Sequence, residues 1–333
     1  MTKIFAYGFR ADEEIVLVPW LEKHPDVKVD TTNQLLTLET VGLAEGYDII
    51  NLLQVDLPLD EAVLIKIRDC GIKTINYRSA GMDDLPFELL KKYNFNVSTV
   101  PNYSPNAIAE HTMIQMARLF RHMKQMDIKV YKYNFKFVPT IGREVRKQTI
   151  GVIGTGKIGR EVIKIAQGFG AKVIAYSPRH DADLEAQGIY VDTLDELYAQ
   201  ADGITLHAPA IPETYHMIDD AAIAKMKDQV VIINTARGPL VDIDAVVAGL
   251  DSGKIDGFSL DVYEKELGLF KIDWEGKDLP DATMNDLITR ENVIVSPHTS
   301  FYTWTAAEEM VWQSLDAGLT FLAGGVPEQA VKL

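Results

Sequence analysis

Four polar positions in the second half of the chain come just after apolar runs, at the points where β-strands are expected to end. They are His207, Arg237, the acidic stretch from Asp261 to Glu266, and His298. In an open α/β sheet, ligands bind in the crevice outside the carboxyl ends of the strands. We therefore expect these side chains to share one ligand-binding edge.

Three of these side chains have the types needed to reduce a 2-oxo acid by hydride transfer. Arg237 can bind a carboxylate through two parallel N–H donors, and His298 can protonate the alkoxide that develops from the carbonyl. Glu266, if hydrogen-bonded to His298, would favour its protonated form and fix its tautomer. Each residue alone has an ordinary structural interpretation, and only the shared edge favours catalysis.

The stretch 148–177 predicts where a dinucleotide would bind. A strand is followed by Gly-Thr-Gly-Lys-Ile-Gly at 154–159, a helical pattern and a second strand, which together form a βαβ unit of about 30 residues. Gly154 permits a tight turn, Gly156 lets backbone N–H groups approach a pyrophosphate, and Gly159 lets helix and strand pack closely. The predicted elements are a strand Thr149–Ile153, a helix Gly159–Phe169 and a strand Lys172–Tyr176.

The end of the second strand of this unit departs from the usual pattern for NAD. Sites that prefer NAD place an Asp or Glu about 20 residues after the glycines, where it binds the ribose 2′-hydroxyl. Here Ser177 takes that place, followed closely by Arg179. An arginine could pair with a 2′-phosphate that no carboxylate repels, which indicates NADP(H) or the use of both cofactors. The alternative is a solvent-exposed turn whose arginine binds nothing.

Composition excludes several other classes of protein. A chain of 333 residues suits two domains, and a net charge of −15 argues against a nucleic-acid partner. The single cysteine, Cys70, excludes an intrachain disulfide and fits a reducing cytoplasm. No apolar run reaches the roughly 18 residues of a membrane span, and the N-terminus lacks the features of a signal peptide. We expect a cytoplasmic protein without a membrane partner.

Residues 1 to about 100 alternate between strand and helix patterns, which is typical of a parallel sheet covered by helices. This part has no glycine fingerprint of its own, so we expect it to hold the substrate. The predicted strands are Ile4–Tyr7, Val27–Val29, Asp48–Leu52, Thr74–Tyr77 and Val97–Thr99, and the predicted helices are Ile15–Glu22, Thr40–Ala44 and Leu59–Cys70.

A hinge and an arm come next in the chain. Ser104 and Pro105 predict the start of a helix that runs to Phe120 and connects the two sheets. Residues 121–147 are basic and aromatic with little periodicity. Nucleic-acid binding is one interpretation of this stretch. The overall acidity instead favours an arm that packs on a second subunit.

Alternation resumes after the βαβ unit. The predicted strands are Gly203–His207, Val230–Asn234, Gly257–Val262 and Val293–Ser296, and the predicted helices are Leu194–Ala201, Asp220–Met226, Asp242–Ser252 and Trp304–Ala323. Because the last helix follows the second sheet directly, we expect it to return to the N-terminal domain.

Five runs together carry a resemblance to a known family. They are Val100–Glu110, Gly151–Gly159, Gly168–Val173, Asn234–Asp242 and Ser296–His298. As a set, and over essentially the whole chain, they resemble the D-isomer-specific 2-hydroxyacid dehydrogenases. The closest likeness is to the D-lactate and D-2-hydroxyisocaproate dehydrogenases of lactic acid bacteria.

The resemblance implies a fold, an activity and an assembly. The fold would be α/β, with two doubly wound Rossmann-like parallel-sheet domains joined by hinge helices. Residues 103–297 would bind NAD(H) and/or NADP(H), and residues 1–102 with 298–333 would form the substrate domain. The activity would be the reversible reduction of 2-oxo acids to D-2-hydroxy acids by a homodimer without a metal.

The family's catalytic arginine, glutamate and histidine match Arg237, Glu266 and His298, the same three residues chosen from their chemistry. The substrate-binding residues implied by the resemblance are Leu53, Ala80, Gly81, Tyr103 and Tyr302. The cofactor-binding residues are Gly154, Thr155, Gly156, Lys157, Ile158, Gly159, Ser177, Arg179, His207, Ala208, Pro209, Thr214, Thr235, Ala236 and Asp261, the last toward the nicotinamide amide.

Two departures from the family pattern leave specificity open. Ser177 replaces the acidic residue used for NAD, and Leu53 lies where D-lactate dehydrogenases carry tyrosine. A leucine at this position resembles the pattern of the hydroxyisocaproate enzymes, and it leaves space for branched or aromatic 2-oxo acids as well as pyruvate. Alternative functions on the same fold are a dinucleotide-sensing co-repressor or scaffold, and the oxidation of formate or 3-phosphoglycerate.

Overall fold

The chain forms two compact units, each with its own parallel sheet. The first unit is Met1–Ser104 with Tyr302–Leu333, and the second is Pro105–Phe301. The structure is a computed structural model that describes residues 1–54, 57, 59–82 and 85–333. The chain thus passes between the units a few residues beyond the predicted boundaries at 102/103 and 297/298.

A five-stranded parallel sheet in the order β2-β1-β3-β4-β5 forms the first unit. Its strands are β1 (Thr2–Tyr7), β2 (Val27–Thr31), β3 (Ile49–Leu52), β4 (Thr74–Tyr77) and β5 (Asn96–Ser98). Alternate residues of a strand point to opposite faces. Accordingly, Phe5 and Tyr7 belong to one apolar core, and Ile4 and Ala6 belong to another.

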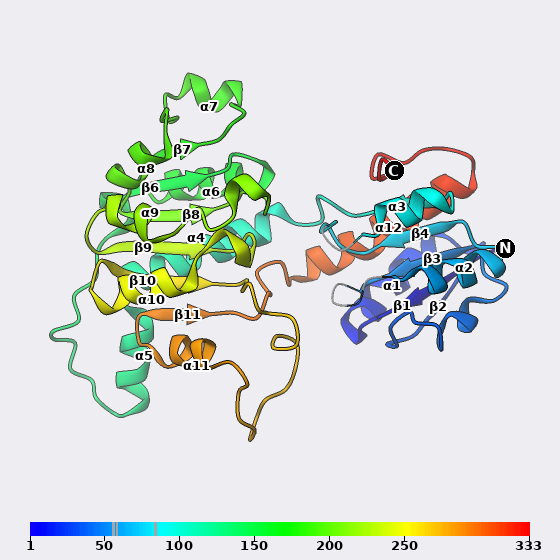
Figure 1. The fold of residues 1–333 in the computed structure, drawn as a ribbon, viewed down its shortest axis with the longest axis horizontal. Helices are drawn as coiled ribbons and strands as arrows, with labels where there is room; N and C mark the ends of the chain where they lie inside the picture. The colour runs from blue at the N-terminus through cyan, green and yellow to red at the C-terminus, as the bar shows by residue number, and fades with distance from the viewer. Residues whose placement is uncertain (55–56, 58, 83–84) are drawn as a thin grey trace. The chain divides into compact units, whose positions relative to one another are not determined.

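Helices cover both faces of this sheet, and they are α1 (Ala11–Lys23), the short 3₁₀ helix η1 (Val41–Ala44), α2 (Glu61–Asp69), α3 (Phe87–Lys92) and α12 (Trp304–Leu322). The last helix, α12, packs against α1 and β4 of this unit (Figure 1). A buried polar contact fixes its position. Asn51 Nδ2 donates to Ser314 Oγ at 2.9 Å, and Asn76 Nδ2 donates to the Ser314 carbonyl at 2.8 Å.

The second unit contains a six-stranded parallel sheet in the order β11-β10-β9-β8-β6-β7. Its strands are β6 (Thr149–Ile153), β7 (Lys172–Tyr176), β8 (Gly203–Leu206), β9 (Val230–Asn234), β10 (Ile255–Leu260) and β11 (Val293–Val295). Along β9, Val231 and Ile233 contribute to one core, and Val230 and Ile232 to the core on the other face. The whole strand is therefore buried, as is typical of a central parallel strand.

The helices of the second unit are α4 (Pro105–Phe120), α5 (Met123–Tyr131), η2 (Val145–Lys147), α6 (Lys157–Gly168), α7 (Ala182–Ala186), α8 (Leu194–Gln200), η3 (Pro212–Thr214), α9 (Asp220–Lys225), η4 (Gly238–Leu240), α10 (Ile243–Asp251) and α11 (Ala282–Thr289). Helix α4 begins at Pro105, as predicted, and packs against α6, β9 and β10. It thus crosses behind the strands that carry the polar positions.

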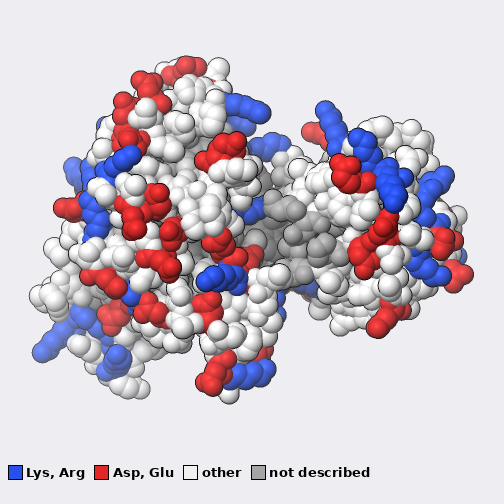
Figure 2. Space-filling view, viewed as in Figure 1, with Lys and Arg blue, Asp and Glu red and all other residues white. Residues whose placement is uncertain are grey.

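The predicted α/β class with two parallel sheets is confirmed. The short helices α3, α5, α7 and α11 were not predicted, and α5 lies within the arm 121–147, where no buried residue marks a helical face. Acidic and basic side chains are interspersed on the drawn face of the protein (Figure 2). Within the described residues, no helix is both long and apolar enough to span a membrane.

Candidate active site

The glycine loop between β6 and α6 has the shape of a dinucleotide cradle. Gly154 has a φ of +94°, and a Cβ on it would lie 2.5 Å from the His207 carbonyl oxygen. A Cβ on Gly159 would lie 2.0 Å from the Gly154 carbonyl oxygen, so helix and loop touch there. A Cβ on Gly156 would meet nothing within 4 Å, which leaves open space where a pyrophosphate would lie. The residues present therefore fit a dinucleotide.

The rest of this loop leads into the first turn of α6, where Lys157 and Ile158 lie. Thr155 Oγ1 lies 2.8 Å from the Tyr190 hydroxyl, and that hydroxyl accepts from the Asp181 backbone N–H at 3.0 Å. The ring of His180 stacks on Tyr190 with the centroids 3.9 Å apart. The glycine loop and the turn after β7 are therefore held together.

Ser177 and Arg179 lie in this turn after β7. Ser177 is half-buried and Arg179 is exposed. Arg179 makes no hydrogen bond or ion pair with any residue in the described part of the chain, whereas nearby Arg160 is paired with Asp181 at 2.6 Å. A guanidinium without a partner among the described residues therefore lies near the expected ribose position.

His207 and its neighbours form the loop after β8. Burial lowers the pKa of His207 to about 3, and its Nε2 lies 2.9 Å from Thr205 Oγ1. His207 is thus neutral at ordinary pH and cannot supply the proton for reduction. Further along the loop, which includes Ala208, the Thr214 hydroxyl donates to the Pro209 carbonyl at 2.6 Å and closes the turn.

Arg237 follows the end of β9, in the run Thr235-Ala236-Arg237. The backbone carbonyl of Arg237 accepts from Asn234 Nδ2 at 2.9 Å, and the Arg237 side chain donates from Nη1 to the Ala236 carbonyl at 2.8 Å. The next residue, Gly238, touches the turn that carries Glu266, since a Cβ there would lie 2.2 Å from the Glu264 backbone nitrogen. The arginine and the glutamate turn are therefore in contact through the backbone.

Asp261 organises the ends of β10 and β11. The residue is only 1% exposed. Its carboxylate accepts hydrogen bonds from the backbone N–H groups of Thr299 at 2.8 Å and Ser300 at 2.9 Å. Its backbone carbonyl accepts from the N–H of His298 at 2.7 Å. The structure thus shows Asp261 holding the loop of His298. Its predicted contact with the nicotinamide amide stays a prediction.

His298 and Glu266 form the pair expected of a proton donor and its partner. His298 Nδ1 lies 2.8 Å from Glu266 Oε1, while Glu266 Oε2 accepts from the Tyr263 N–H at 3.0 Å. Burial would raise the pKa of Glu266, but the hydrogen bond and charge of His298 outweigh it and the pKa is lowered. Glu266 is thus ionised and orients the ring, so Nε2 of His298 is the atom that can serve a substrate.

The predicted substrate residues lie at the carboxyl ends of strands in the first unit. Leu53 follows β3, while Ala80 and Gly81 follow β4, and all three are half-buried. Arg78, at the start of the second loop, is 0% exposed and donates to Glu13 Oε1 at 3.0 Å and to the Gly8 carbonyl at 3.1 Å. This buried pair fixes the loops after β1 and β4 to each other.

Tyr103 and Tyr302 lie at the two ends of the first unit's segments, next to the passages into the second unit. The Tyr302 ring lies 5.6 Å from the Arg10 guanidinium carbon, and Tyr302 is 52% exposed.

Two histidines outside the predicted set of site residues, His111 and His216, lie beside the site. His111 Nε2, on α4, lies 3.1 Å from Ser296 Oγ. His216 Nε2 lies 3.0 Å from Glu264 Oε2, in the turn that carries Glu266. Both contacts join residues far apart in the sequence, and no local motif marks them.

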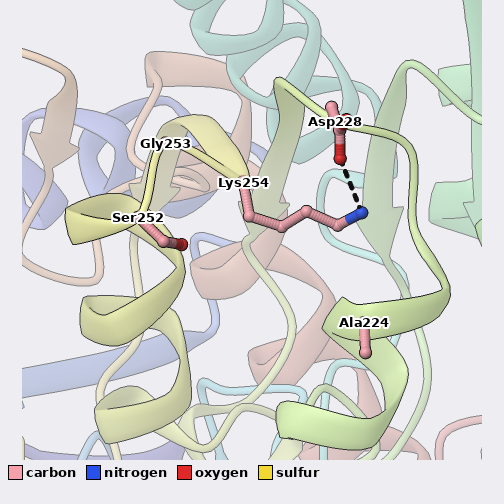
Figure 3. Close-up of a pocket in the computed structure, with 5 residues that line it drawn as sticks. All are labelled: Ala224, Asp228, Ser252, Gly253 and Lys254. Atoms are coloured by element: carbon pink, nitrogen blue, oxygen red, sulfur yellow. Dashed lines mark hydrogen bonds and ion pairs between the residues drawn. The ribbon is translucent and has the colours of Figure 1, made fainter.

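The surface pocket drawn in Figure 3 lies away from these residues. It is lined by Ala224, Asp228, Ser252, Gly253 and Lys254, which precede β9 and β10 at the amino ends of the strands. Lys254 is neutralised by Asp228 at 2.9 Å. Among the described residues, no group of three or more His, Cys, Asp or Glu side chains is placed to hold a metal ion.

Comparison with known proteins places this geometry in a family. The family model for "D-isomer specific 2-hydroxyacid dehydrogenase, NAD binding domain" matches residues 113–300, which lie within the second unit. The chain belongs to the D-isomer-specific 2-hydroxyacid dehydrogenase family. It is therefore an oxidoreductase with an NAD-binding domain.

Particular relatives agree with this assignment over the whole chain. The sequence is 51% identical to a D-lactate dehydrogenase of Lactobacillus delbrueckii subsp. bulgaricus over 333 residues, 100% of both chains. The fold matches that of a D-2-hydroxyisocaproate dehydrogenase with a TM-score of 0.92 at 37% identity over 99% of each chain. It also matches the NAD-complexed form of a D-isomer specific 2-hydroxyacid dehydrogenase from Lactobacillus delbrueckii ssp. bulgaricus with a TM-score of 0.89 at 35% identity, covering 99% of this chain and 100% of the other.

Proposed function

We propose that the chain reduces 2-oxo acids to D-2-hydroxy acids reversibly, with His298 as general acid and base, Glu266 as its partner and Arg237 as the substrate-binding cation. The observation that carries the proposal is the 2.8 Å contact between His298 Nδ1 and the ionised Glu266. Both residues belong to the same sheet edge as Arg237. The D configuration of the product follows from the family alone.

Each residue has a defined task in this reaction. Arg237 binds the substrate carboxylate and polarises the neighbouring carbonyl through its fork of N–H donors. When bound, the dinucleotide supplies the hydride that adds to the carbonyl carbon. His298 gives its Nε2 proton to the carbonyl oxygen, and Glu266 stabilises the imidazolium before transfer and retains the Nδ1–H bond afterwards. Reversal of these steps oxidises the hydroxy acid.

We propose that residues of the first unit also take part in binding the substrate. Leu53, Ala80, Gly81, Tyr103 and Tyr302 are the residues concerned, with the backbone N–H groups of Ala80 and Gly81 directed to the carboxylate. The buried Arg78–Glu13 pair supports this role because it fixes the loop from which those two amides come.

The substrate range proposed here extends beyond pyruvate to branched and aromatic 2-oxo acids. Leu53 is smaller than the tyrosine typical of D-lactate dehydrogenases, and it cannot hydrogen-bond to a substrate. The match to a D-2-hydroxyisocaproate dehydrogenase supports a pocket of this type. A kcat/KM for pyruvate well above that for phenylpyruvate would contradict this part of the proposal.

We propose that the enzyme uses NADP(H) as well as NAD(H). The arginine of the turn after β7 is exposed and has no partner among the described residues, and Ser177 brings no negative charge to repel a 2′-phosphate. Gly154, Thr155, Gly156, Lys157, Ile158 and Gly159 would cradle the pyrophosphate, helped by the N-terminus of α6. The loops at 207–214 and 235–236, with Asp261, would face the remainder of the cofactor.

The arm at 121–147 supports a homodimer. Lys124 Nζ anchors α5 by donating to the carbonyls of Arg290 and Val293, both at 2.7 Å, while the residues beyond it expose large apolar side chains. The exposed fractions are Tyr131 84%, Tyr133 87%, Phe135 76%, Phe137 76% and Ile141 85%. Large apolar side chains exposed together on one segment favour an interface, and a second copy of the same chain is the usual occupant in soluble oligomers. Free Cys70 is consistent with a cytoplasmic location, which we also propose.

The experiment that tests the function follows nicotinamide absorbance with purified protein and phenylpyruvate, pyruvate or 2-oxoisocaproate, using NADH and NADPH in parallel. We expect turnover with both cofactors and D-configured products by chiral chromatography. Silence with every acid and both cofactors would contradict the proposed activity. Turnover with NADH alone would remove only the proposal on NADPH.

A further inference from the structure

A hydrogen-bonded chain links helix α4 to the loop of His298 through the second unit. His111 Nε2 lies 3.1 Å from Ser296 Oγ, and Ser296 Oγ donates to Asp261 Oδ1 at 2.6 Å. Asp261 then holds three consecutive residues of the loop, through its carbonyl to His298 and through its carboxylate to Thr299 and Ser300. Each of these hydrogen bonds joins residues that are far apart in the sequence.

The direction of each hydrogen bond follows from the atoms present. Ser296 Oγ donates to Asp261 Oδ1, so the single hydrogen of the Ser296 hydroxyl is used in that bond. The Ser296 oxygen is then left as an acceptor, and His111 Nε2–H must be its donor. His111 Nε2 also lies 3.2 Å from the side-chain nitrogen of Gln115, whose oxygen accepts from Arg118 at 3.1 Å. A hydrogen bond from the Gln115 nitrogen would require His111 Nε2 to carry no hydrogen. Because the Ser296 hydrogen is used by Asp261, His111 Nε2 instead carries a hydrogen and donates it to Ser296.

Charge and burial support a neutral His111 with its hydrogen on Nε2. Burial lowers the pKa of His111, Asp261 opposes that effect, and Arg118 adds to it. A neutral imidazole carries one hydrogen, and the Ser296 contact places it on Nε2. A neutral ring in this tautomer is therefore the form that completes the chain.

The loop needs this support because His298 has an unfavourable backbone conformation. Its φ of +56° lies in the left-handed region, which is unfavourable for a residue with a side chain and persists only where the surroundings impose it. The hydrogen bonds of Asp261 to residues 298–300 hold the loop in this conformation. Ser296 in turn bonds to Asp261, and His111 bonds to Ser296. A small displacement of this loop would move Nε2 of His298, the atom that gives the proton.

We propose that His111 is a positioning residue for the proton donor, acting on His298 through Ser296 and Asp261. Helix α4 starts at one passage between the units, and the 296–301 loop leads to the other passage. The His111–Ser296 contact therefore ties together, inside the second unit, both segments that leave it. The proposal rests on the role of His298 given above.

The test compares steady-state kinetics of the full-length enzyme with His111→Leu, Ser296→Ala and the double variant. We expect each single variant to lower kcat about tenfold, as a misplaced catalytic group does, while the KM for NADH stays within about twofold. If His111 acts through Ser296, the double variant should be little worse than the more damaged single variant. His24→Leu makes the same substitution at a half-exposed histidine of the first unit and should keep parental kinetics.

A matched pair separates positioning from simple packing and also covers the case in which His111→Leu does not fold. Gln can place its Nε2 near that of the histidine, whereas Asn is too short. We expect His111→Gln to retain most of kcat and His111→Asn to lose about tenfold. A kcat for His111→Leu within about twofold of the parent, additive losses in the double variant, or equal losses in the Gln and Asn variants would each overturn the proposal. Loss of activity in His298→Gln with no effect at His111 would overturn this inference and leave the proposed function standing.

Discussion

His298 donates from Nδ1 toward Oε1 of Glu266 at 2.8 Å, while the other oxygen of Glu266 is held by its own turn. The Glu266 carboxylate cannot rotate away without losing its hydrogen bond from the Tyr263 N–H. The imidazole ring of His298 is therefore oriented through its Nδ1. Nε2 of His298 makes no hydrogen bond with any residue in the described ranges. The pair therefore defines which nitrogen carries the transferable proton.

Replacing His298 by Ala should abolish reduction while leaving cofactor affinity near normal. Proton-transfer groups typically contribute about 10²–10⁴-fold, so kcat should fall by that order. Steady-state kinetics give kcat, and nucleotide fluorescence titration gives the Kd for NADH. Activity retained within about tenfold would show that another group supplies the proton.

Arg237→Lys keeps the positive charge but loses the planar fork of donors. We expect the KM for the 2-oxo acid to rise by about tenfold or more and kcat to fall less, because binding of the carboxylate depends on two parallel hydrogen bonds. Arg146→Lys, an exposed arginine paired with Glu144, serves as the control. Kinetics equal to those of the control would remove Arg237 from the substrate site.

Ser177→Asp should shift preference toward NADH. A carboxylate at this position would bind the ribose hydroxyls of NADH and repel the 2′-phosphate of NADPH. The ratio of kcat/KM for NADPH to that for NADH should fall in this variant. Arg179→Gln should also lower the ratio, by reducing kcat/KM for NADPH while leaving kcat/KM for NADH unchanged. Lys172→Gln, at the other end of the same strand, is the control for loss of a positive charge. An unchanged ratio in both variants would mean that this turn does not contact the ribose.

The pH dependence of stability should change in His207→Gln. The pKa of His207 is lowered to about 3 in the folded protein, whereas an unfolded histidine titrates near 6.5. Between these values the unfolded state binds the additional proton, so the folded state loses stability as the pH falls. Thermal unfolding from pH 7.5 to pH 4.5 should show a smaller fall in Tm for the variant than for the parent. Parallel curves would indicate that His207 takes up a proton in the folded protein.

Two charges placed on the exposed arm should separate a dimer. Tyr133→Asp combined with Phe135→Asp would bury two carboxylates without partners in any interface there. Sedimentation equilibrium should give the mass of one chain for this variant and twice that mass for the parent. Ile15→Asp, at a 62% exposed position of α1, should leave the parental mass unchanged. A parent with the mass of one chain would contradict the homodimer itself.

The sequence was informative where a single pattern determines the structure. The βαβ unit, the helix that begins at Pro105 and the alternation of both sheets are local signals. The structure has them within a residue or two, except that the helix predicted at Ile15–Glu22 begins at Ala11. Helix α5 could not be found in this way because it has no buried face. Helices α3, α7 and α11 are short, so each presents few apolar positions to count.

The same distinction applies to the candidate site. Arg237, Glu266 and His298 stand at strand ends, where position along the chain already indicates an edge of the sheet. Ser296 and His111 are 185 residues apart, and only the crossing of α4 behind the sheet brings them together. The carboxylate of Asp261 was predicted to face a cofactor, and its backbone partners at Thr299 and Ser300 depend on a loop whose shape no local pattern encodes.

The placement of α12 on the first sheet has a consequence for the order of folding during synthesis. The second unit is continuous, so it can fold once Phe301 has left the ribosome, whereas the first unit still lacks the helix that contributes Ser314 and Leu315 to its interior. Until then, the buried amides of Asn51 and Asn76 lack their Ser314 partners. The N-terminal segment Met1–Ser104, although translated first, therefore cannot complete its native packing until α12 has been made.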